Sequence, residues 1–345
     1  MKSVAVTALV GAAALTLASC SSDDPAEEPS DDTSATEEAD DEMEEGGGLP
    51  ETLTLALVPS DEQEQITTDG EALAASLSAE LGVEVEVFVP ESYSAVVVAL
   101  QTGQADIGFL GPIAMVQAED EAGAEIVLQS VRFGSSEYVG QWFTNDPDTY
   151  CLDDVTTEAD EDGINYSYCN GATGGTGPAG EDALALLTAD SSIAFVDASS
   201  ASGYYFPATQ LGGILGLSDP STEFTNVDWV GGHPQAVQAV YDGDFEVGIS
   251  YNDARTSLAE EFPDVGEQVV VFAYTSNIPN DGVVVSGDLS DEAKTMITDG
   301  LLAIAETEDG AAALAAVYEI DGLEPANLDA FNNTVRPVEE SFGEE

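Results

Sequence analysis

Short apolar runs alternate along this chain with longer segments whose apolar residues repeat at helical spacing. Residues 52–58 form one such run, and residues 83–89 alternate apolar and polar side chains with the period of two that is typical of a half-buried strand. Between them, residues 69–81 have helical periodicity. One face of this segment carries Leu73, Leu77 and Leu81. A strand, a helix and a strand in this order predict a βαβ unit.

The same alternation continues over most of the remaining chain. Further strands are predicted at residues 106–110, 192–196, 245–250 and 268–274. Further helices are predicted at residues 93–102, 113–119, 204–211, 291–306 and 310–318. We therefore expect the α/β fold class, with open, mostly parallel sheets flanked by helices. In such folds the ligand crevice lies at the carboxyl ends of the strands.

The length of the chain and an interruption in the pattern predict two lobes. At roughly 100–200 residues per domain, 345 residues suggest two compact units. A polar, glycine-rich stretch at residues 145–180 interrupts the alternation, which then resumes. We expect two crossings between the lobes, which make the first lobe discontinuous. Lobe 1 is predicted to contain residues 51–140 plus 277–345, and lobe 2 residues 141–276.

The first fifty residues carry export signals. Residues 1–19 combine one lysine with an apolar stretch too short to span a bilayer, which predicts a secretory signal peptide. The three residues before Cys20, Leu-Ala-Ser, resemble the bacterial lipobox, which implies lipidation of the Cys20 thiol; an ordinary signal peptide with a chance cysteine is the alternative. Residues 20–50 are acidic and almost devoid of apolar side chains, which predicts a disordered tether. We expect an extracytoplasmic protein, lipid-anchored to the outer face of the cytoplasmic membrane.

The charge balance argues against several partners. The chain has 5 Lys and Arg residues against 68 Asp and Glu residues, and its formal net charge is −63. Such a surface repels nucleic-acid phosphates and anionic lipid headgroups. We therefore expect no nucleic-acid partner, and contact with the membrane through the lipid anchor only. A high-salt setting or selection for solubility would explain the acidity.

Motifs for covalent chemistry are absent from the sequence, and its cysteines indicate a structural role. The chain contains no GxSxG, HExxH or GxxxxGK[ST] pattern, and His233 is its one histidine. We therefore predict no catalytic residue, no metal site and no cofactor. Cys151 and Cys169 lie eighteen positions apart in a polar segment of an exported chain, which predicts a disulfide that closes a surface loop.

A turn between a predicted strand and a predicted helix carries the clearest binding signal. Residues 197–203 read Asp-Ala-Ser-Ser-Ala-Ser-Gly. Hydroxyls and free amides at the start of a helix can cradle an oxyanion without any positive side chain. Plain capping of the helix by Ser200 or Ser202 is the alternative.

Three further polar residues stand at the ends of predicted elements. His233 lies at an expected helix start, where it can donate to an anion. Asp253 and Asp281 each follow a predicted strand, near the edge of the sheet where α/β crevices lie. A capping histidine, a solvated aspartate and a turn aspartate are the alternatives.

Four segments of the chain resemble the phosphate/phosphite/phosphonate-binding components of bacterial ABC importers. They are PESYSAVVVAL with GQADIGFLGP in residues 90–112, FVDASSASGYYFP at residues 195–207, GGH at residues 231–233 and IPND at residues 278–281. The similarity runs in order over nearly all of residues 52–336, and the Ser-Ala-Ser-Gly turn with its flanking strand and helix is its most specific part. It implies the two-lobed type II periplasmic-binding-protein fold, with a two-strand hinge and a ligand enclosed between the lobes. The insertion that carries the cysteines is also similar to that of actinobacterial members.

The resemblance also implies a set of ligand contacts. Serines and an alanine of the turn would cradle the phosphorus-bound oxygens, the histidine would donate to the same group, tyrosines would wall the pocket, and carboxylates would lie near the substituent on phosphorus. The implied residues are Tyr93, Tyr138, Ser200, Ala201, Ser202, His233, Asp253 and Asp281. Two positions depart from the family pattern. Ala201 stands where many members have Thr, and Asp253 stands where members that bind aminoalkylphosphonates have Glu.

We therefore expect a solute-binding receptor of an ABC importer. It would capture a small phosphorus oxyanion, which is a phosphonate, phosphite or phosphate, by hinge closure and deliver it to a permease and its ATPase. We expect a monomer that is not an enzyme. A buried aspartate beside an oxyanion is repulsive unless it accepts a proton-bearing group, so the site should discriminate against sulfate. Two alternatives stay open: the same scaffold binding a different small solute, and an extracytoplasmic sensor lipoprotein.

Overall fold

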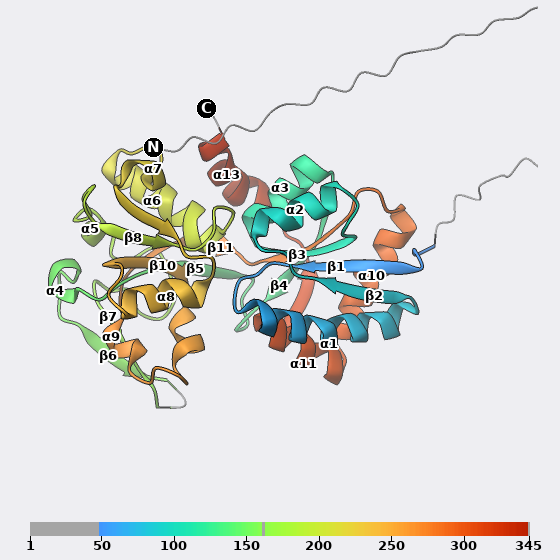
Figure 1. Cartoon of the computed structure of the whole chain (residues 1–345), viewed down its shortest axis with the longest axis horizontal. Coiled ribbons are helices and arrows are strands. Elements are labelled where there is room, and N and C mark those ends of the chain that lie inside the picture. Colours follow the sequence, from blue (N-terminus) through green and yellow to red (C-terminus); the bar gives the residue numbers. More distant parts are fainter. Residues whose placement is uncertain (1–47, 161–162, 344–345) are drawn as a thin grey trace, which may run out of the picture. The chain divides into compact units, whose positions relative to one another are not determined.

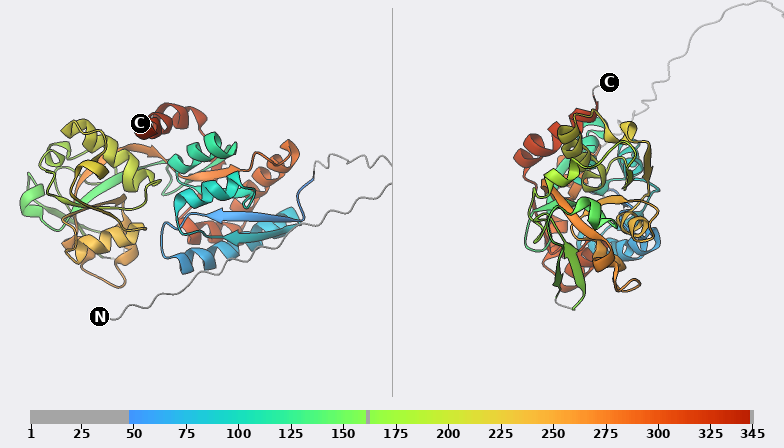
Figure 2. Two further views of the ribbon diagram at one scale, coloured as in Figure 1. Left: turned by 45° about the horizontal axis from the view of Figure 1, so that its top comes forward. Right: turned by 90° about the vertical axis from the view of Figure 1, so that its left-hand side faces the viewer.

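Two sheets, each covered by helices on both faces, organise the described part of the chain (Figure 1, Figure 2). The computed structural model describes residues 48–160 and 163–343. The predicted signal peptide, Cys20 and the tether up to residue 47 lie outside the described residues. Both sheets belong to one compact unit. The expected α/β fold class is confirmed.

The first sheet contains six strands. They are β1 (Thr52–Leu57), β2 (Glu84–Phe88), β3 (Ile107–Leu110), β4 (Glu125–Val131), β12 (Gly282–Val285) and β13 (Gly322–Pro325). Their spatial order is β13-β4-β12-β3-β1-β2. β1 pairs in parallel with β2 and β3, and the remaining neighbours pair antiparallel.

Helices cover the first sheet because its strands bury both faces. Leu53, Leu55 and Leu57 of β1 pack on one face, and Ala56 packs on the other, since successive side chains of a strand alternate. The first face is covered by α1 (Gln63–Leu81), α10 (Asp291–Ala305) and α11 (Glu308–Tyr318). The other is covered by α2 (Tyr93–Gln101) and α3 (Pro112–Ala122), which lie above the sheet in Figure 1.

The second sheet contains seven strands. They are β5 (Glu137–Thr144), β6 (Thr156–Ala159), β7 (Asn165–Tyr168), β8 (Ser192–Phe195), β9 (Asn226–Trp229), β10 (Val247–Tyr251) and β11 (Val270–Pro279). Their spatial order is β6-β7-β11-β5-β10-β8-β9. One face packs against α6 (Phe206–Leu215), which continues a π-helical turn, η1 (Ala201–Tyr205); the other packs against α8 (His233–Tyr241).

The remaining helices of the described chain are short or C-terminal. The short ones are α4 (Pro147–Tyr150), α5 (Glu181–Leu184), α7 (Pro220–Glu223), η2 (Ala254–Leu258) and α9 (Val265–Gln268). The chain ends in three consecutive helical pieces: α12 (Leu328–Ala330), η3 (Phe331–Val335) and α13 (Arg336–Gly343). Nowhere in the described residues is there a helix long and apolar enough to cross a membrane.

Both sheets are mixed, whereas the sequence predicts mostly parallel ones. β8 is parallel to β9 and β10, but β5 is antiparallel to both β10 and β11. In the first sheet β12 is inserted antiparallel between β3 and β4. The apolar pattern identifies a buried strand but does not encode the direction of its neighbours, which explains the difference.

The chain passes from the first sheet to the second between β4 and β5 and returns between β11 and β12. β5 and β11 pair along their length in the second sheet, from Glu137 opposite Pro279 to Thr144 opposite Val270. The predicted lobe boundaries near residues 140 and 277 therefore fall within these two crossing strands.

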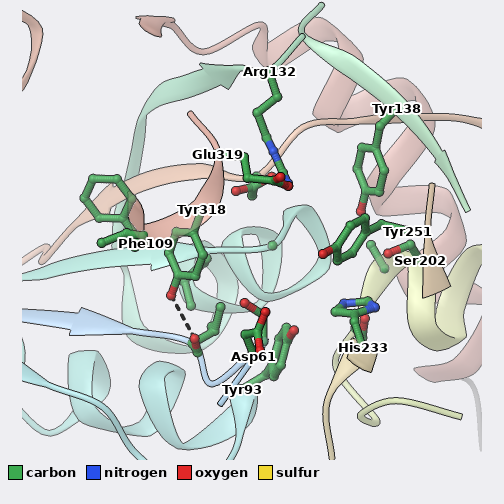
Figure 3. A pocket seen from close by; sticks show the side chains of 18 of the residues that line it. Asp61, Tyr93, Phe109, Arg132, Tyr138, Ser202, His233, Tyr251, Tyr318 and Glu319 are labelled. Carbon is green, nitrogen blue, oxygen red and sulfur yellow. Dashed lines mark hydrogen bonds and ion pairs between the residues drawn. The ribbon is translucent and has the colours of Figure 1, made fainter. Parts of the chain in front are cut away.

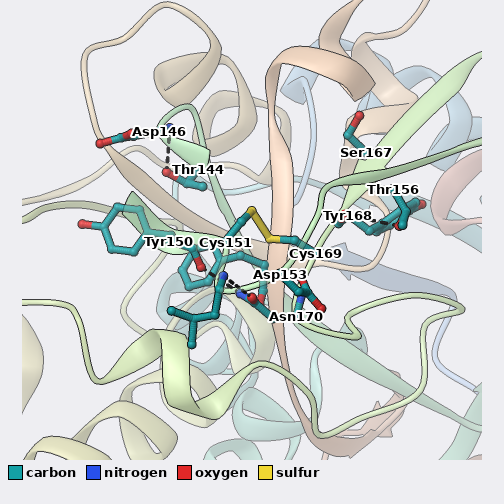
Figure 4. The surroundings of a disulfide bond; sticks show 12 residues. Thr144, Asp146, Tyr150, Cys151, Asp153, Thr156, Ser167, Tyr168, Cys169 and Asn170 are labelled. Atoms are coloured by element: carbon teal, nitrogen blue, oxygen red, sulfur yellow. Dashed lines mark hydrogen bonds between the residues drawn. A yellow bond between two sulfur atoms is a disulfide. The ribbon is translucent and has the colours of Figure 1, made fainter. Parts of the chain in front are cut away.

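The predicted disulfide between Cys151 and Cys169 is confirmed. Their Cα atoms lie 5.6 Å apart, and the bond closes the segment that carries β6 and β7, directly after α4 (Figure 4). Asn170 supports it: the Asn170 amide donates to the carbonyls of Tyr150 at 2.8 Å and Phe272 at 3.0 Å. The disulfide therefore joins the two ends of the insertion, and the Asn170 bond to Phe272 links it to β11.

Candidate functional site

A cavity of about 330 Å³ is lined by residues from both sheets. The first sheet contributes the segments after β1, β3 and β4 and the end of α11, and the second contributes the starts of η1 and α8 and the segment after β10. Most of the predicted ligand-binding residues line it: Tyr93, Tyr138, Ser200, Ala201, Ser202, His233 and Asp281. Figure 3 shows Ser202, His233 and Tyr251 close together on one side of the cavity.

The serine-rich turn begins a helix at this cavity. Ser200 is the N-cap, and its hydroxyl accepts from the Gly203 N–H at 3.0 Å, so the capping interpretation holds for this residue. The first amides of a helix have no partner within it, and here those amides start at Ala201 beside the cavity. Gly203 lets the turn approach Val196, the residue after β8, because a Cβ at position 203 would lie only 2.4 Å from the Val196 side chain. A π-helical turn of this kind is frequent at functional sites.

His233 opens α8 as a buried, neutral donor. Its Nδ1 lies 2.8 Å from the Ser250 hydroxyl, and its backbone N–H donates to the Ser60 carbonyl at 3.2 Å. Burial, and secondly the charge of Arg132, lowers the pKa of His233 to about 3. The imidazole is therefore uncharged at neutral pH. When Nδ1 accepts from Ser250, the remaining proton sits on Nε2 and is available for a ligand.

Four tyrosines line the cavity: Tyr93, Tyr138, Tyr251 and Tyr318. Burial is the main cause that raises the pKa of each phenol, so all four stay protonated and can donate. Tyr138 is hydrogen-bonded to Ser202, which links a wall of the cavity to the turn. Tyr318 already donates its proton to the Val58 carbonyl at 2.8 Å, so the phenols left for a ligand are those of Tyr93, Tyr138 and Tyr251. The cavity thus offers neutral donors around the start of η1.

Arg132 also lines the cavity. The sequence analysis expected an oxyanion site without positive side chains, and this residue corrects that expectation. Its Nη1 lies 3.5 Å from Asp281 Oδ1, and its Nη2 lies 3.0 Å from Glu319 Oε2. Its guanidinium stands 5.5 Å from the centre of the Tyr251 ring. Burial by itself lowers the pKa of Arg132, but Asp281, Tyr251 and Glu319 raise it, so the group stays charged.

Carboxylates nevertheless outnumber cations in the lining. Among the described residues that line the cavity there are three carboxylates, Asp61, Asp281 and Glu319, and one guanidinium, that of Arg132. An oxyanion that enters this space meets net negative charge, which opposes binding unless the ligand brings a proton or a cation toward the carboxylates.

Asp253 does not line the cavity, which corrects its predicted role. Its carboxylate pairs with the fully buried Arg255 at 2.5 Å and also accepts from Tyr168 at 3.2 Å. Arg255 in turn donates to backbone carbonyls, including Val269 O at 2.6 Å. Burial alone would raise the pKa of Asp253, but Arg255 lowers it below the usual range. This pair holds η2 against β7 and α9, and both carboxylate oxygens of Asp253 already accept hydrogen bonds from the protein.

Comparison with known proteins places this geometry in a family. A family model for the periplasmic, phosphonate-binding substrate-binding proteins of ABC transporters matches residues 55–331. The chain belongs to this family. It is a family of transport substrate-binding proteins and not of enzymes.

Individual members of the phosphonate-binding family are distant in sequence. The phosphate-import protein PhnD of Mycolicibacterium smegmatis is 27% identical over 210 residues, which cover 59% of this chain and 56% of that protein. The chain therefore matches little more than half of that curated relative's length.

Two solved structures show the shared fold. PhnD1 of Prochlorococcus marinus, in complex with methylphosphonate, is 16% identical with a TM-score of 0.68 and covers 86% of this chain and 99% of its own. A binding component of an ABC phosphonate transporter from Pseudomonas aeruginosa is 18% identical with a TM-score of 0.66 and covers 84% and 85%. The type II periplasmic-binding-protein fold expected from the sequence is thus confirmed.

Sequence reasoning missed several lining residues of this family member, above all Arg132, Tyr251, Glu319 and Asp61. One signal in the sequence could have identified Arg132. It is one of only 5 Lys and Arg residues in a chain with 68 Asp and Glu residues, and it directly follows a buried strand. Glu319 is placed by a left-handed backbone (φ 54°) at the end of α11, which periodicity does not reveal.

Proposed function

We propose that this protein is the solute-binding receptor of an ABC importer and that it captures a small phosphorus oxyanion in the cavity between its two sheets. The observation that carries the proposal is the capped helix start at Ser200, Ala201 and Ser202, which lines one cavity with the neutral imidazole of His233. Amide and hydroxyl donors at a helix N-terminus hold an anion through the dipole and direct hydrogen bonds. Phosphonate, phosphite and phosphate are the candidate ligands.

The carboxylates of the cavity give this receptor its selectivity. Asp281 and Glu319 pair with Arg132, the one cationic side chain among the described lining residues. A further proton or positive charge beside these carboxylates must therefore come from the ligand. A P–OH group or a ligand ammonium supplies it, and sulfate has neither near neutral pH. The site therefore prefers a protonated oxyanion or a zwitterion.

Capture takes place by hinge closure. We assign lobe 1 to residues 51–140 plus 277–345 and lobe 2 to residues 141–276, with β5 and β11 as the hinge strands. The described arrangement already contains bonds from one sheet's elements to the other's: His233 N–H to Ser60 O at 3.2 Å, and Gln235 Nε2 to Glu62 Oε1 at 2.8 Å. A ligand that contacts both sides adds to these bonds and stabilises the closed state.

The receptor is delivered to the outside of the cell and held there. We assign residues 1–19 to a signal peptide, Cys20 to the lipid anchor and residues 20–50 to the tether. Family membership supports an extracytoplasmic location and a permease with its ATPase as partners. A tethered monomer stays near its permease, which raises its effective concentration there. We expect no cofactor, metal or nucleic-acid partner for this receptor.

A thermal-shift screen in high salt tests the proposed function. The purified protein is heated with phosphate, phosphite, methylphosphonate, 2-aminoethylphosphonate or sulfate. A ligand that binds only the folded state, at about 100 times its Kd, adds about 2.7 kcal/mol to the unfolding free energy. We expect a raised Tm with at least one phosphorus compound and none with sulfate. No shift with any phosphorus compound, on folded protein, would refute the proposal.

A further inference from the structure

The C-terminal helix α13 lies against two helices that both begin at the cavity (Figure 1, Figure 2). One is α3, which starts at Pro112 directly after the lining residue Gly111. The other is η1 with its continuation α6, which starts at the lining residue Ala201. α3 belongs to the first sheet and η1 to the second, so α13 contacts an element of each.

The first end of α13 is held to α3 by charge. Arg336 forms ion pairs with Glu119 and Asp120, which lie in the last turns of α3. The Arg336 side chain is 22% exposed and its partners are more exposed, so salt weakens this link.

The other end of α13 is held to η1 by aromatic packing. The ring centre of Phe342 lies 5.3 Å from that of Tyr204 and 5.2 Å from that of Tyr205, and both tyrosines are buried in η1. These separations suit favourable aromatic pairs. Salt does not screen this contact.

A third contact closes the junction between the three helices. Gln117 of α3 donates to the Tyr205 hydroxyl at 3.2 Å and is also hydrogen-bonded to Glu339 of α13. Tyr205 follows Ser202 by three residues, which is less than one turn of helix. A displacement of Tyr204 or Tyr205 therefore moves the amides and hydroxyls that the ligand needs.

We propose that α13 is a positioning element of the binding site: it holds the start of η1 against α3 in the geometry that binds the ligand. None of the described residues of α13 lines the cavity, so it acts through η1. The inference rests on the proposed function. Phe342 and Arg336 are its positioning residues, and the phenylalanine gives the part that persists in high salt.

Phe342→Ala tests the inference with Phe88→Ala as its matched control. Phe88 is an exposed phenylalanine at the end of β2 that does not line the cavity and does not contact α13 or η1. We expect Phe342→Ala to raise the Kd of the phosphorus ligand chosen by the thermal-shift screen by about tenfold, which corresponds to about 1.4 kcal/mol. Phe88→Ala should leave the Kd unchanged, and Phe342→Leu should recover part of the affinity. Titration calorimetry on each folded variant gives the Kd values.

Arg336→Gln provides a milder variant and a salt signature. It should raise the Kd at low salt and have no effect at about 1 M salt, where the Debye length is about 3 Å. Phe342→Ala should weaken binding at both salt concentrations. Trp229 adds a spectroscopic readout, because its ring lies 4.8 Å from that of Tyr204 and it is 40% exposed, while Trp142 is fully buried. Acrylamide quenching therefore reports mainly Trp229 and should change in ligand-free Phe342→Ala.

The outcomes separate this inference from the proposed function. If Phe342→Ala lowers the Tm but keeps the wild-type Kd and quenching, α13 is only structural and the inference is wrong. If the wild-type protein binds no phosphorus compound, the proposed function itself fails. If the wild type binds a phosphorus compound and Phe342→Ala binds it more weakly at both salt concentrations, the proposed function and the inference are both supported.

Discussion

Replacing Ser202 by alanine separates ligand binding from helix capping. Ser202 is 2% exposed and lines the cavity, but the N-cap bond to Gly203 comes from Ser200. A hydrogen bond to a charged group contributes about 1.5–3 kcal/mol, and about 1.4 kcal/mol is tenfold in affinity. We therefore expect Ser202→Ala to raise the Kd of the phosphorus ligand by about 10- to 150-fold. The lost bond to Tyr138 is replaced by water in the free cavity, so the unfolding free energy should change little.

Two serine variants serve as matched controls for Ser202→Ala. Ser200→Ala removes a cap as well as a cavity hydroxyl, so it should weaken binding and also lower the unfolding free energy by about 1 kcal/mol. Ser290 caps α10 by accepting from the Ala293 N–H at 3.1 Å and does not line the cavity. Ser290→Ala should therefore lower stability by a similar amount and leave the Kd unchanged.

Calorimetry and denaturant unfolding on the three variants decide the matter. We expect Ser202→Ala to lose affinity alone and Ser290→Ala to lose stability alone. Ser200→Ala should lose both affinity and stability. A wild-type Kd in Ser202→Ala would refute the assignment of the η1 start as the oxyanion cradle.

Three further predictions concern the charged and titratable groups. Asp281→Asn should lower the affinity for the phosphorus ligand and reduce the ratio of this affinity to that for sulfate. An unchanged ratio in competition calorimetry would contradict the role of this carboxylate. Because burial and then Arg132 lower the pKa of His233 to about 3, against about 6.5 in an unfolded chain, the contribution of His233 to stability is complete above pH 6.5 and is lost as the pH falls toward 3, by up to about 1.4 kcal/mol per pH unit. His233→Gln should show a shallower loss than wild type in urea unfolding between pH 7 and 4.5, and identical slopes would show that the imidazole is not neutral when folded. Arg255→Met leaves the Asp253 carboxylate buried without its cation and should cost about 3–5 kcal/mol in denaturant unfolding, while the Kd of the folded protein stays at its wild-type value.

Periodicity predicted most elements but not their ends. The helix expected over residues 69–81 begins earlier, at Gln63. The pattern missed its first turns because they bury little beyond Ile66 and so carry no apolar stripe. The helix expected from residue 204 begins earlier, at Ala201. The sequence did not show this start because serines also favour turns and a π-helical turn has no apolar pattern of its own. Strand direction was lost for the same reason: alternation records burial only.

The candidate site was predictable where its residues are contiguous. Ser200, Ala201 and Ser202 stand together in the sequence and line the cavity together. Arg132 reaches the same cavity from a turn after β4, which only the tertiary fold reveals. Asp253 shows the opposite error, because its position after a strand indicated a ligand contact while Arg255, two residues later, binds its carboxylate.

A crystal structure of the protein with the phosphorus compound that raises its Tm most would test the central claim most directly. The account predicts that oxygens on phosphorus lie within hydrogen-bonding distance of the Ser202 hydroxyl, the amides at the start of η1 and His233 Nε2, with the substituent toward Asp281. A ligand bound outside this cavity, or held by Arg132 without contact to η1, would contradict it.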